Sequence, residues 1–205
     1  MGRGRKKVGV VGGDHSVPLG LMRVMAERYP GVGVLHIDAH ADLRKAYEGF
    51  TYSHASIMYN ALQEAPGIGA LVQVGIRDFC DEELETARAD KRVVQFPDHE
   101  LAAAGFAGET WQQVCNRIVE TLPKQVYVSF YIDFFSPDNC PHTGTPLPGG
   151  LSFREAVYLL VTVVESGREI VGFDLCEVAP SHEEEWDANV GARILYKLCN
   201  LALKA

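Results

Sequence analysis

The chain has 205 residues and a formal net charge of −8, an acidic balance that argues against a nucleic-acid partner, which needs a basic face. Apolar residues make up 47% and charged residues 22%, as in a globular domain rather than a disordered chain. No apolar run reaches the roughly 20 residues of a membrane span. We expect the basic run at 3–7 to be a solvated tail.

The five cysteines are odd in number, widely spaced and without a CxxC pair. This pattern disfavours a disulfide framework and favours a reducing, cytoplasmic setting. Cys199 lies in an apolar context, and we expect it to be a small core residue.

Short apolar runs rich in β-branched residues alternate along the chain with longer segments of helical pattern. The expected strands are 7–12, 32–38, 70–77, 92–96, 125–133 and 168–177. The expected helices are 18–28, 55–63, 81–89, 110–122, 153–165 and 188–203.

Strict alternation of strand and helix predicts a three-layer α/β fold with a parallel sheet and helices on both faces. The expected strands are nearly continuous in apolar residues, as in a sheet that is buried on both faces. No linker or internal repeat interrupts the pattern, so we expect a single domain over 1–205.

Metal-binding side chains follow the ends of three expected strands. His15 follows the first strand, Asp38, His40 and Asp42 alternate after the second, and Asp133 ends the fifth. Alternate residues of an extended segment lie on one side, and the carboxyl ends of parallel strands meet at one edge of the sheet. Carboxylate and imidazole without thiolate are ligands that suit Mn²⁺ or Zn²⁺. We therefore predict a divalent metal site.

Three further polar residues lie near these ligands in the sequence pattern. His54 opens a helix and can transfer a proton near neutral pH, although it can also be a simple polar helix-start residue. Glu177 ends an apolar strand and can pair with a planar guanidinium, or else form a structural salt bridge or cap. His36 shares the face of Asp38 and is expected to be a buried, hydrogen-bonded core residue.

Four motifs, taken in chain order, resemble the ureohydrolase family, which includes arginase, agmatinase and formimidoylglutamase. They are Gly-Gly-Asp-His-Ser at 12–16, Asp-Ala-His-Ala-Asp at 38–42, Ser-Phe-Tyr-Ile-Asp at 129–133 with Thr-Gly-Thr-Pro-Leu-Pro-Gly-Gly at 143–150, and Asp-Leu-Cys-Glu-Val-Ala-Pro at 174–180. The segments 52–54 and 187–193 most resemble the agmatinase-like members.

The resemblance implies an arginase/deacetylase-like fold and two Mn²⁺ ions at the carboxyl end of the sheet. Carried over by motif, one metal would be held by His15, Asp38 and Asp42. The other would be held by Asp38, His40 and Asp133.

The resemblance also implies a reaction, in which a metal-bound hydroxide attacks a linear guanidino compound such as agmatine and releases urea and an amine. His54 would be the proton shuttle, and Glu177 would bind the guanidinium group.

Tyr131 departs from the family pattern, because it stands where the family has an Asp that bridges both metals. A neutral phenol is a poor substitute for a carboxylate, so two weakly held metals, one metal or none can result. Two alternatives to the enzyme therefore stay open. One is a catalytically impaired homologue that acts as a binding or structural subunit, and the other is a mononuclear amide hydrolase that uses Asp38, His40 and Asp133.

A second departure is length, because family members usually carry a further segment before the first motif. A missing strand would leave unpaired backbone and uncovered apolar surface at the edge of the sheet. We therefore expect a homo-oligomer, or a truncated form of modest stability.

Overall fold

A sheet of six parallel strands forms the centre of the computed structural model, which describes residues 6–179, 181 and 185–204. The strand order is β1-β6-β5-β2-β3-β4. The strands are β1 (Val8–Val11), β2 (Val32–Ile37), β3 (Ile68–Val74), β4 (Val93–Phe96), β5 (Gln125–Tyr131) and β6 (Glu169–Cys176). All six were predicted, each within a few residues of its observed bounds.

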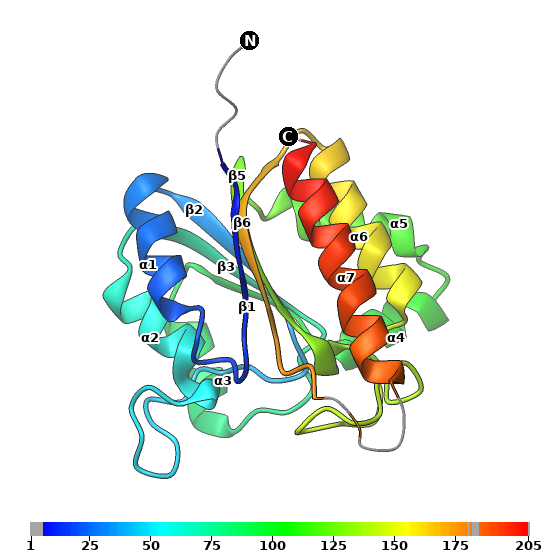
Figure 1. Ribbon diagram of the computed structural model, residues 1–205, viewed down its shortest axis with the longest axis horizontal. Helices are drawn as coiled ribbons and strands as arrows, with labels where there is room; N and C mark the ends of the chain where they lie inside the picture. Colours follow the sequence, from blue (N-terminus) through cyan, green and yellow to red (C-terminus); the bar gives the residue numbers. More distant parts are fainter. Residues whose placement is uncertain (1–5, 180, 182–184, 205) are drawn as a thin grey trace.

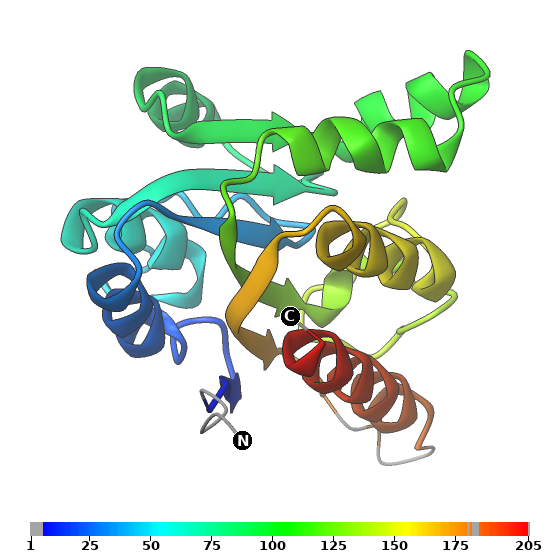
Figure 2. The same ribbon diagram turned by 90° about the horizontal axis from the view of Figure 1, so that it is seen from above.

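Helices cover both faces of this sheet (Figure 1). They are α1 (Leu19–Arg28), α2 (Ile57–Glu64), α3 (Asp81–Ala89), α4 (Asp98–Phe106), α5 (Trp111–Glu120), α6 (Phe153–Glu165) and α7 (Trp186–Leu203), with short 3-10 helices η1 (His54–Ser56) and η2 (Ile132–Phe134). Seen from above, α1 to α3 lie on one side of the sheet and α5 to α7 on the other (Figure 2). The predicted three-layer parallel α/β fold is confirmed.

Helix α4 is the one α-helix of the described residues that the sequence pattern did not predict. Its sequence, Asp-His-Glu-Leu-Ala-Ala-Ala-Gly-Phe, has no apolar stripe, and only Leu101 in it is buried. A helix without such a stripe gives no periodic signal, so neighbouring packing decides its structure.

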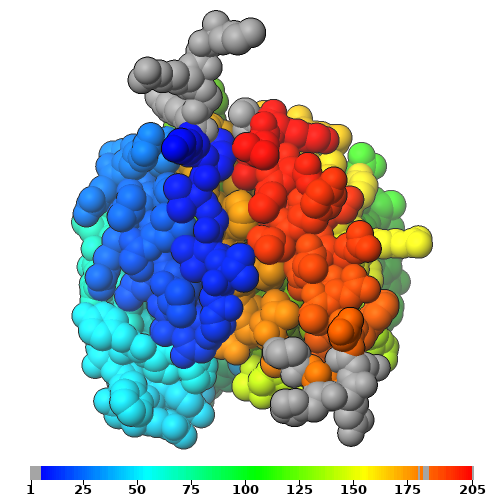
Figure 3. Space-filling model, in the orientation of Figure 1, coloured from blue at the N-terminus to red at the C-terminus, as the bar shows by residue number. Residues whose placement is uncertain are grey.

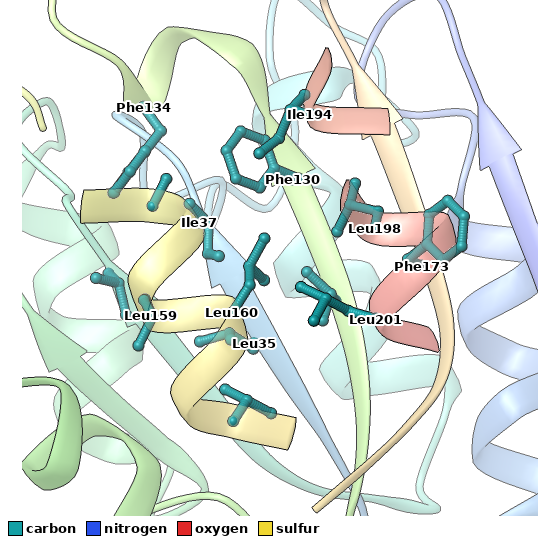
Figure 4. Packing of buried hydrophobic residues seen from close by; sticks show 14 of the residues in the cluster. Leu35, Ile37, Phe130, Phe134, Leu159, Leu160, Phe173, Ile194, Leu198 and Leu201 are labelled. Carbon is teal, nitrogen blue, oxygen red and sulfur yellow. The ribbon is translucent and has the colours of Figure 1, made fainter. Parts of the chain in front are cut away.

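The larger hydrophobic core fills the space between the sheet and helices α5 to α7. Figure 4 shows side chains of β2 and β5, Leu35, Ile37 and Phe130, against Leu160 of α6 and Leu198 of α7. All five are fully buried. Each such side chain stabilises the fold by about 1.5–3 kcal/mol, and together they hold β2 and β5 rigidly at the centre of the sheet.

Strand β1 forms one edge of the sheet and, among the described strands, pairs only with β6. In Figure 3 this first part of the chain lies at the surface beside α7. Val8 and Val11 are 45% and 61% exposed, so β1 offers apolar surface and one unpaired backbone side to solvent.

The cysteine thiols are all free, and three of them, Cys115, Cys140 and Cys176, are buried. The prediction that Cys199 is a core residue is wrong, because it lies on the exposed side of α7. The prediction relied on the apolar residues adjacent to Cys199 in sequence, but adjacent residues of a helix do not lie on the same face. None of the described helices has the length and apolarity needed to cross a membrane. Of the predicted basic tail, residues 3–5 lie outside the described residues.

We expect Gly75→Ala to destabilise the fold by about 2–4 kcal/mol. Gly75 has a left-handed backbone (φ 89°), and a Cβ atom there would lie 2.6 Å from the Phe134 ring. The matched control is Gly105→Ala in α4, where a Cβ would meet nothing within 4 Å and helix propensity favours Ala by up to about 1 kcal/mol. Urea unfolding measures both changes, and equal stability of the two variants would contradict the prediction.

Native thiol labelling should modify Cys199 quickly and leave Cys115 and Cys140 unmodified. Burial raises the pKa of the latter two thiols to about 12, so thiolate is scarce at pH 8 and the reagent has no access. Mass spectrometry of peptides after a short exposure to an aromatic disulfide reagent tests this. Fast labelling of Cys115 or Cys140, in the unmodified chain or in Cys199→Ser, would contradict it.

Candidate metal centre

The Asp38 carboxylate lies just beyond the end of β2, the strand between β5 and β3, and it is fully buried. Its Oδ2 lies 3.2 Å from Nδ1 of His15, and its Oδ1 lies 3.5 Å from Nδ1 of His40. The backbone N–H of His40 donates to Oδ1 at 2.7 Å. Each oxygen of one carboxylate therefore faces a different imidazole.

The first ligand cluster lies on the His15 side of Asp38. His15 Nδ1 lies 2.8 Å from Oδ2 of Asp42, and both side chains are buried. Asp42 has a left-handed backbone (φ 53°), a conformation that aspartate tolerates better than most residues. The possible ligand atoms of His15, His36, Asp38 and Asp42 all lie within 4.8 Å of one another, so this group can hold a metal ion.

The second cluster lies on the other side of the same carboxylate. It consists of Asp38, His40 and Asp133, whose ligand atoms also lie within 4.8 Å of one another. Asp133, in the 3-10 turn directly after β5, places its Oδ2 3.0 Å from His40 Nδ1. The structure therefore brings all five predicted ligands together in two groups that share Asp38.

Hydrogen bonds to the carboxylates change the protonation of both imidazoles. Burial alone lowers the pKa of His40, but hydrogen bonds to Asp133 and Asp38 outweigh it and raise this pKa to about 11. The pKa of His15 is likewise held well above its ordinary value by Asp38 and Asp42, against the opposing effect of burial. Burial and the adjacent Asp38 charge raise the pKa of Asp133 to about 7.

The donor set fits a divalent cation. Asp38, Asp42 and Asp133 are at most 3% exposed, and buried carboxylates need a compensating positive charge. The donors are oxygen and nitrogen without sulfur, as expected for Mn²⁺ or Zn²⁺.

Tyr131 lies between the two clusters, at the end of β5. Its ring centroid is 5.1 Å from that of His15 and 6.0 Å from that of His40, and the side chain is buried. Thr145 donates to Asp133 at 3.1 Å, which leaves Tyr131 to donate to Thr145 at 3.3 Å. Burial, then the Asp133 and Asp38 charges, raise the pKa of the phenol far above its usual value. Tyr131 therefore stays neutral where a carboxylate would carry charge.

His54 lines a pocket of about 130 Å³ at the mouth of the site, together with His40, Asp42, Tyr131 and Thr145. It is the first residue of η1, and the side chain of Ser53 caps this turn by accepting from the N–H of Ala55. The imidazole therefore faces the space in front of the second cluster.

Glu177 directly follows β6 and reaches the site from the side of His15. Its Oε1 accepts the backbone N–H of His15 at 3.0 Å, and its own backbone is left-handed (φ 64°). Burial raises the pKa of the carboxyl, although the N–H of His15 opposes this shift. The left-handed backbone is a strained conformation for glutamate, and the hydrogen bond from His15 holds the carboxylate beside the first cluster.

The sequence pattern assigned no role to two buried residues behind His15. Ser129 of β5 donates to Asp174 of β6 at 3.1 Å, so its oxygen can accept from His15 Nε2, 2.8 Å away. This leaves His15 Nδ1 directed at Asp38 and Asp42. Ser129 and Asp174 are the first residues of two of the family motifs, but only the pairing of β5 with β6, in which they are register partners, brings them together.

Asp14 has a local role in the turn before α1. Its Oδ1 accepts from both the backbone N–H and the hydroxyl of Ser16, at 3.2 and 2.6 Å. It therefore caps the turn before α1 and does not orient the His15 ring.

A parallel α/β sheet with His and Asp clusters beyond its strand ends is the architecture expected for a metal-dependent hydrolase of the ureohydrolase type. The chain matches the model of the arginase family over residues 3–200, and it belongs to this family.

Individual relatives agree with this assignment. The chain is 41% identical to an N(1)-aminopropylagmatine ureohydrolase of Thermus thermophilus, over 87% of its own length and 57% of that protein. It is 34% identical to the agmatinase of Halalkalibacterium halodurans, over 84% and 56%. The solved structure of proclavaminate amidinohydrolase from Streptomyces clavuligerus superposes with a TM-score of 0.81 at 31% identity, over 97% of this chain and 65% of that one. The chain thus spans somewhat more than half the length of the curated relatives.

We expect Tyr131→Asp to bind Mn²⁺ at least about tenfold more tightly than the unmodified chain, because it restores a carboxylate and removes a ring between the clusters. Elemental analysis after Mn²⁺ loading and desalting gives the ions per chain, and electron paramagnetic resonance tells a coupled pair from single ions.

Tyr131→Phe is the matched control, because it keeps the ring and removes only the hydroxyl. We expect no gain from it. Two tightly held ions in the unmodified chain, with no change in Tyr131→Asp, would contradict the prediction.

Proposed function

We propose that this chain carries the active site of an amidinohydrolase that splits a linear guanidino compound of the agmatine type into urea and an amine. The observation that carries the proposal is the pair of His/Asp clusters that share Asp38, in a member of the arginase family. The names of the similar relatives support agmatine or an aminopropyl derivative of it as the substrate class.

Two Mn²⁺ ions are the proposed cofactors. His15, Asp38 and Asp42 would hold one ion, and Asp38, His40 and Asp133 the other, because their ligand atoms already converge. Bound there, the ions would lower the pKa of a coordinated water and so supply the nucleophile for the guanidinium carbon.

Glu177 is the proposed binding group for the substrate cation. One of its oxygens is held by the backbone N–H of His15, which fixes the carboxylate beside the first cluster. A carboxylate in this fixed position can accept two N–H groups from a planar guanidinium, and so turn the carbon of the guanidinium toward the clusters.

His54 is the proposed proton donor to the departing amine. It lines the same pocket as His40 and Tyr131, so an amine that leaves through this pocket passes its ring. An imidazole can deliver a proton at neutral pH. The amine then departs as a neutral molecule or a cation rather than as a strongly basic anion.

The Tyr131 ring favours a second candidate function, a homologue with weakened metal binding that acts as a binding or structural subunit. The ring lies against both His15 and His40 and brings no charge. Proteins of this second kind would bind guanidino compounds through Glu177 without releasing urea.

Self-association and a cytoplasmic location are further parts of the proposal. The exposed valines of β1 and its unpaired backbone favour association through this edge. Free thiols at all five cysteines are in keeping with a reducing compartment.

We expect urea release from agmatine or aminopropylagmatine after Mn²⁺ loading, and its loss in His40→Ala, which removes a ligand of the second cluster. His54→Ala should keep its metal and lose about 10²–10⁴-fold in kcat, the usual contribution of an acid–base group. A colorimetric urea assay measures both, with metal content determined in parallel.

His99→Ala, an exposed histidine of α4, is the control and should keep full activity. Full urea release by His40→Ala would refute the assignment of the second cluster. Binding of agmatine without urea release, even with two ions bound, would support the second candidate.

A further inference from the structure

A row of hydrogen-bonded polar side chains crosses the sheet from β2 through β3 to β4, behind Asp38. His36 of β2 is the register partner of Gln73 of β3, and Gln73 is the register partner of Gln95 of β4. His36 and Gln73 are both 0% exposed. Polar residues of this kind are rare inside a parallel sheet, and the proposed reaction gives none of them a role.

The orientation of the Gln73 amide follows from its contacts. Its Nε2 lies 2.7 Å from the backbone carbonyl of Ala41, a group that can only accept a hydrogen bond. Its Oε1 accepts from Nε2 of Gln95 at 2.9 Å. The Gln73 nitrogen must therefore face both the Ala41 carbonyl and the His36 ring on the neighbouring strand.

This orientation determines the tautomer of His36. Nδ1 of His36 lies 2.9 Å from the Gln73 nitrogen, which has only hydrogens to offer, so Nδ1 must accept and carries no proton. The ring proton then sits on Nε2, which lies 2.7 Å from Oδ2 of Asp38. His36 donates this proton to the carboxylate.

We propose that His36 is a positioning residue that holds Asp38 in the orientation in which it faces both clusters, and that Gln73 maintains the tautomer required for this. The inference rests on the proposed metal site. His36 lies within ligand distance of the first cluster, but its Nε2 lone pair is taken by a proton that Gln73 keeps there. His36 is therefore not itself a ligand.

The two hydrogen bonds to Asp38 explain why its position matters. Oδ2 accepts from His36, and Oδ1 accepts from the backbone N–H of His40, so the carboxylate cannot rotate. Asp38 is the one carboxylate that the two clusters share among the described residues. With Tyr131 neutral, no second bridge compensates for a misplaced Asp38, and metal affinity depends on the contact from His36.

Nitrogen NMR of the metal-free protein tests the tautomer without reference to any activity. A two-bond ¹H–¹⁵N spectrum should show His36 with Nε2 protonated and Nδ1 unprotonated, its signals assigned by their loss in His36→Gln. On addition of Zn²⁺ alone, the His15 and His40 nitrogens should shift while the His36 Nε2 proton remains. A proton on Nδ1, or replacement of the Nε2 proton by Zn²⁺, would overturn the proposal.

Substitutions test the consequence for metal binding. His36→Leu and Gln73→Met should weaken Mn²⁺ binding about 10–100-fold in calorimetric titration, as expected for groups that orient a ligand. His36→Gln offers an amide N–H in place of Nε2–H and should recover most of this loss. Gln112→Met, an exposed change on α5, is the matched control and should bind like the unmodified chain.

Thermal unfolding of each metal-free variant separates folding defects from ligand positioning. Equal Mn²⁺ affinity in folded His36→Leu and in the unmodified chain would overturn the proposal. Because the tautomer and the affinity are read without substrate, failure to release urea would refute the proposed function and leave this inference intact.

Discussion

Both ligand clusters depend on the fixed position of one carboxylate, that of Asp38, which belongs to both of them. Asp38 follows β2, and the other elements that contribute to the site all lie on one side of this strand, in the order β5, β6 and β1. Asp133 follows β5, Glu177 follows β6 and His15 follows β1. A parallel sheet makes this possible because all its strands end at the same edge, and the packed core beneath β2 and β5 keeps those ends in register (Figure 4).

Burying several carboxylates together is costly unless each is paired. The fold offsets this cost with hydrogen bonds to the two imidazoles, His15 and His36, that contact Asp38. Ser129, itself bonded to Asp174, accepts from the far nitrogen of His15, and Gln73 donates to the far nitrogen of His36. These contacts hold His15 and His36 from behind, while Asp42 and His40 line the pocket on the open side of the site.

Much of this arrangement could be predicted from the sequence, because the ligands occur in short motifs directly after apolar strands. His15, Asp38, His40, Asp42 and Asp133 lie together as expected, and His36 is buried and hydrogen bonded as expected. The partner of His36 was not predictable, since Gln73 becomes its neighbour only through the order in which strands align. The local sequence pattern also failed to predict α4, which has no apolar stripe, and the exposure of Cys199.

The pairing of β1 has a consequence for how the chain folds. Val8 pairs with Gly172, so the first strand meets its partner only after most of the described chain has left the ribosome. Contacts so distant in sequence form slowly, and until then the valines of β1 are exposed to other nascent chains. Because His15 directly follows β1, a cation that binds the first cluster through His15 would stabilise the folded state in which β1 is paired with β6.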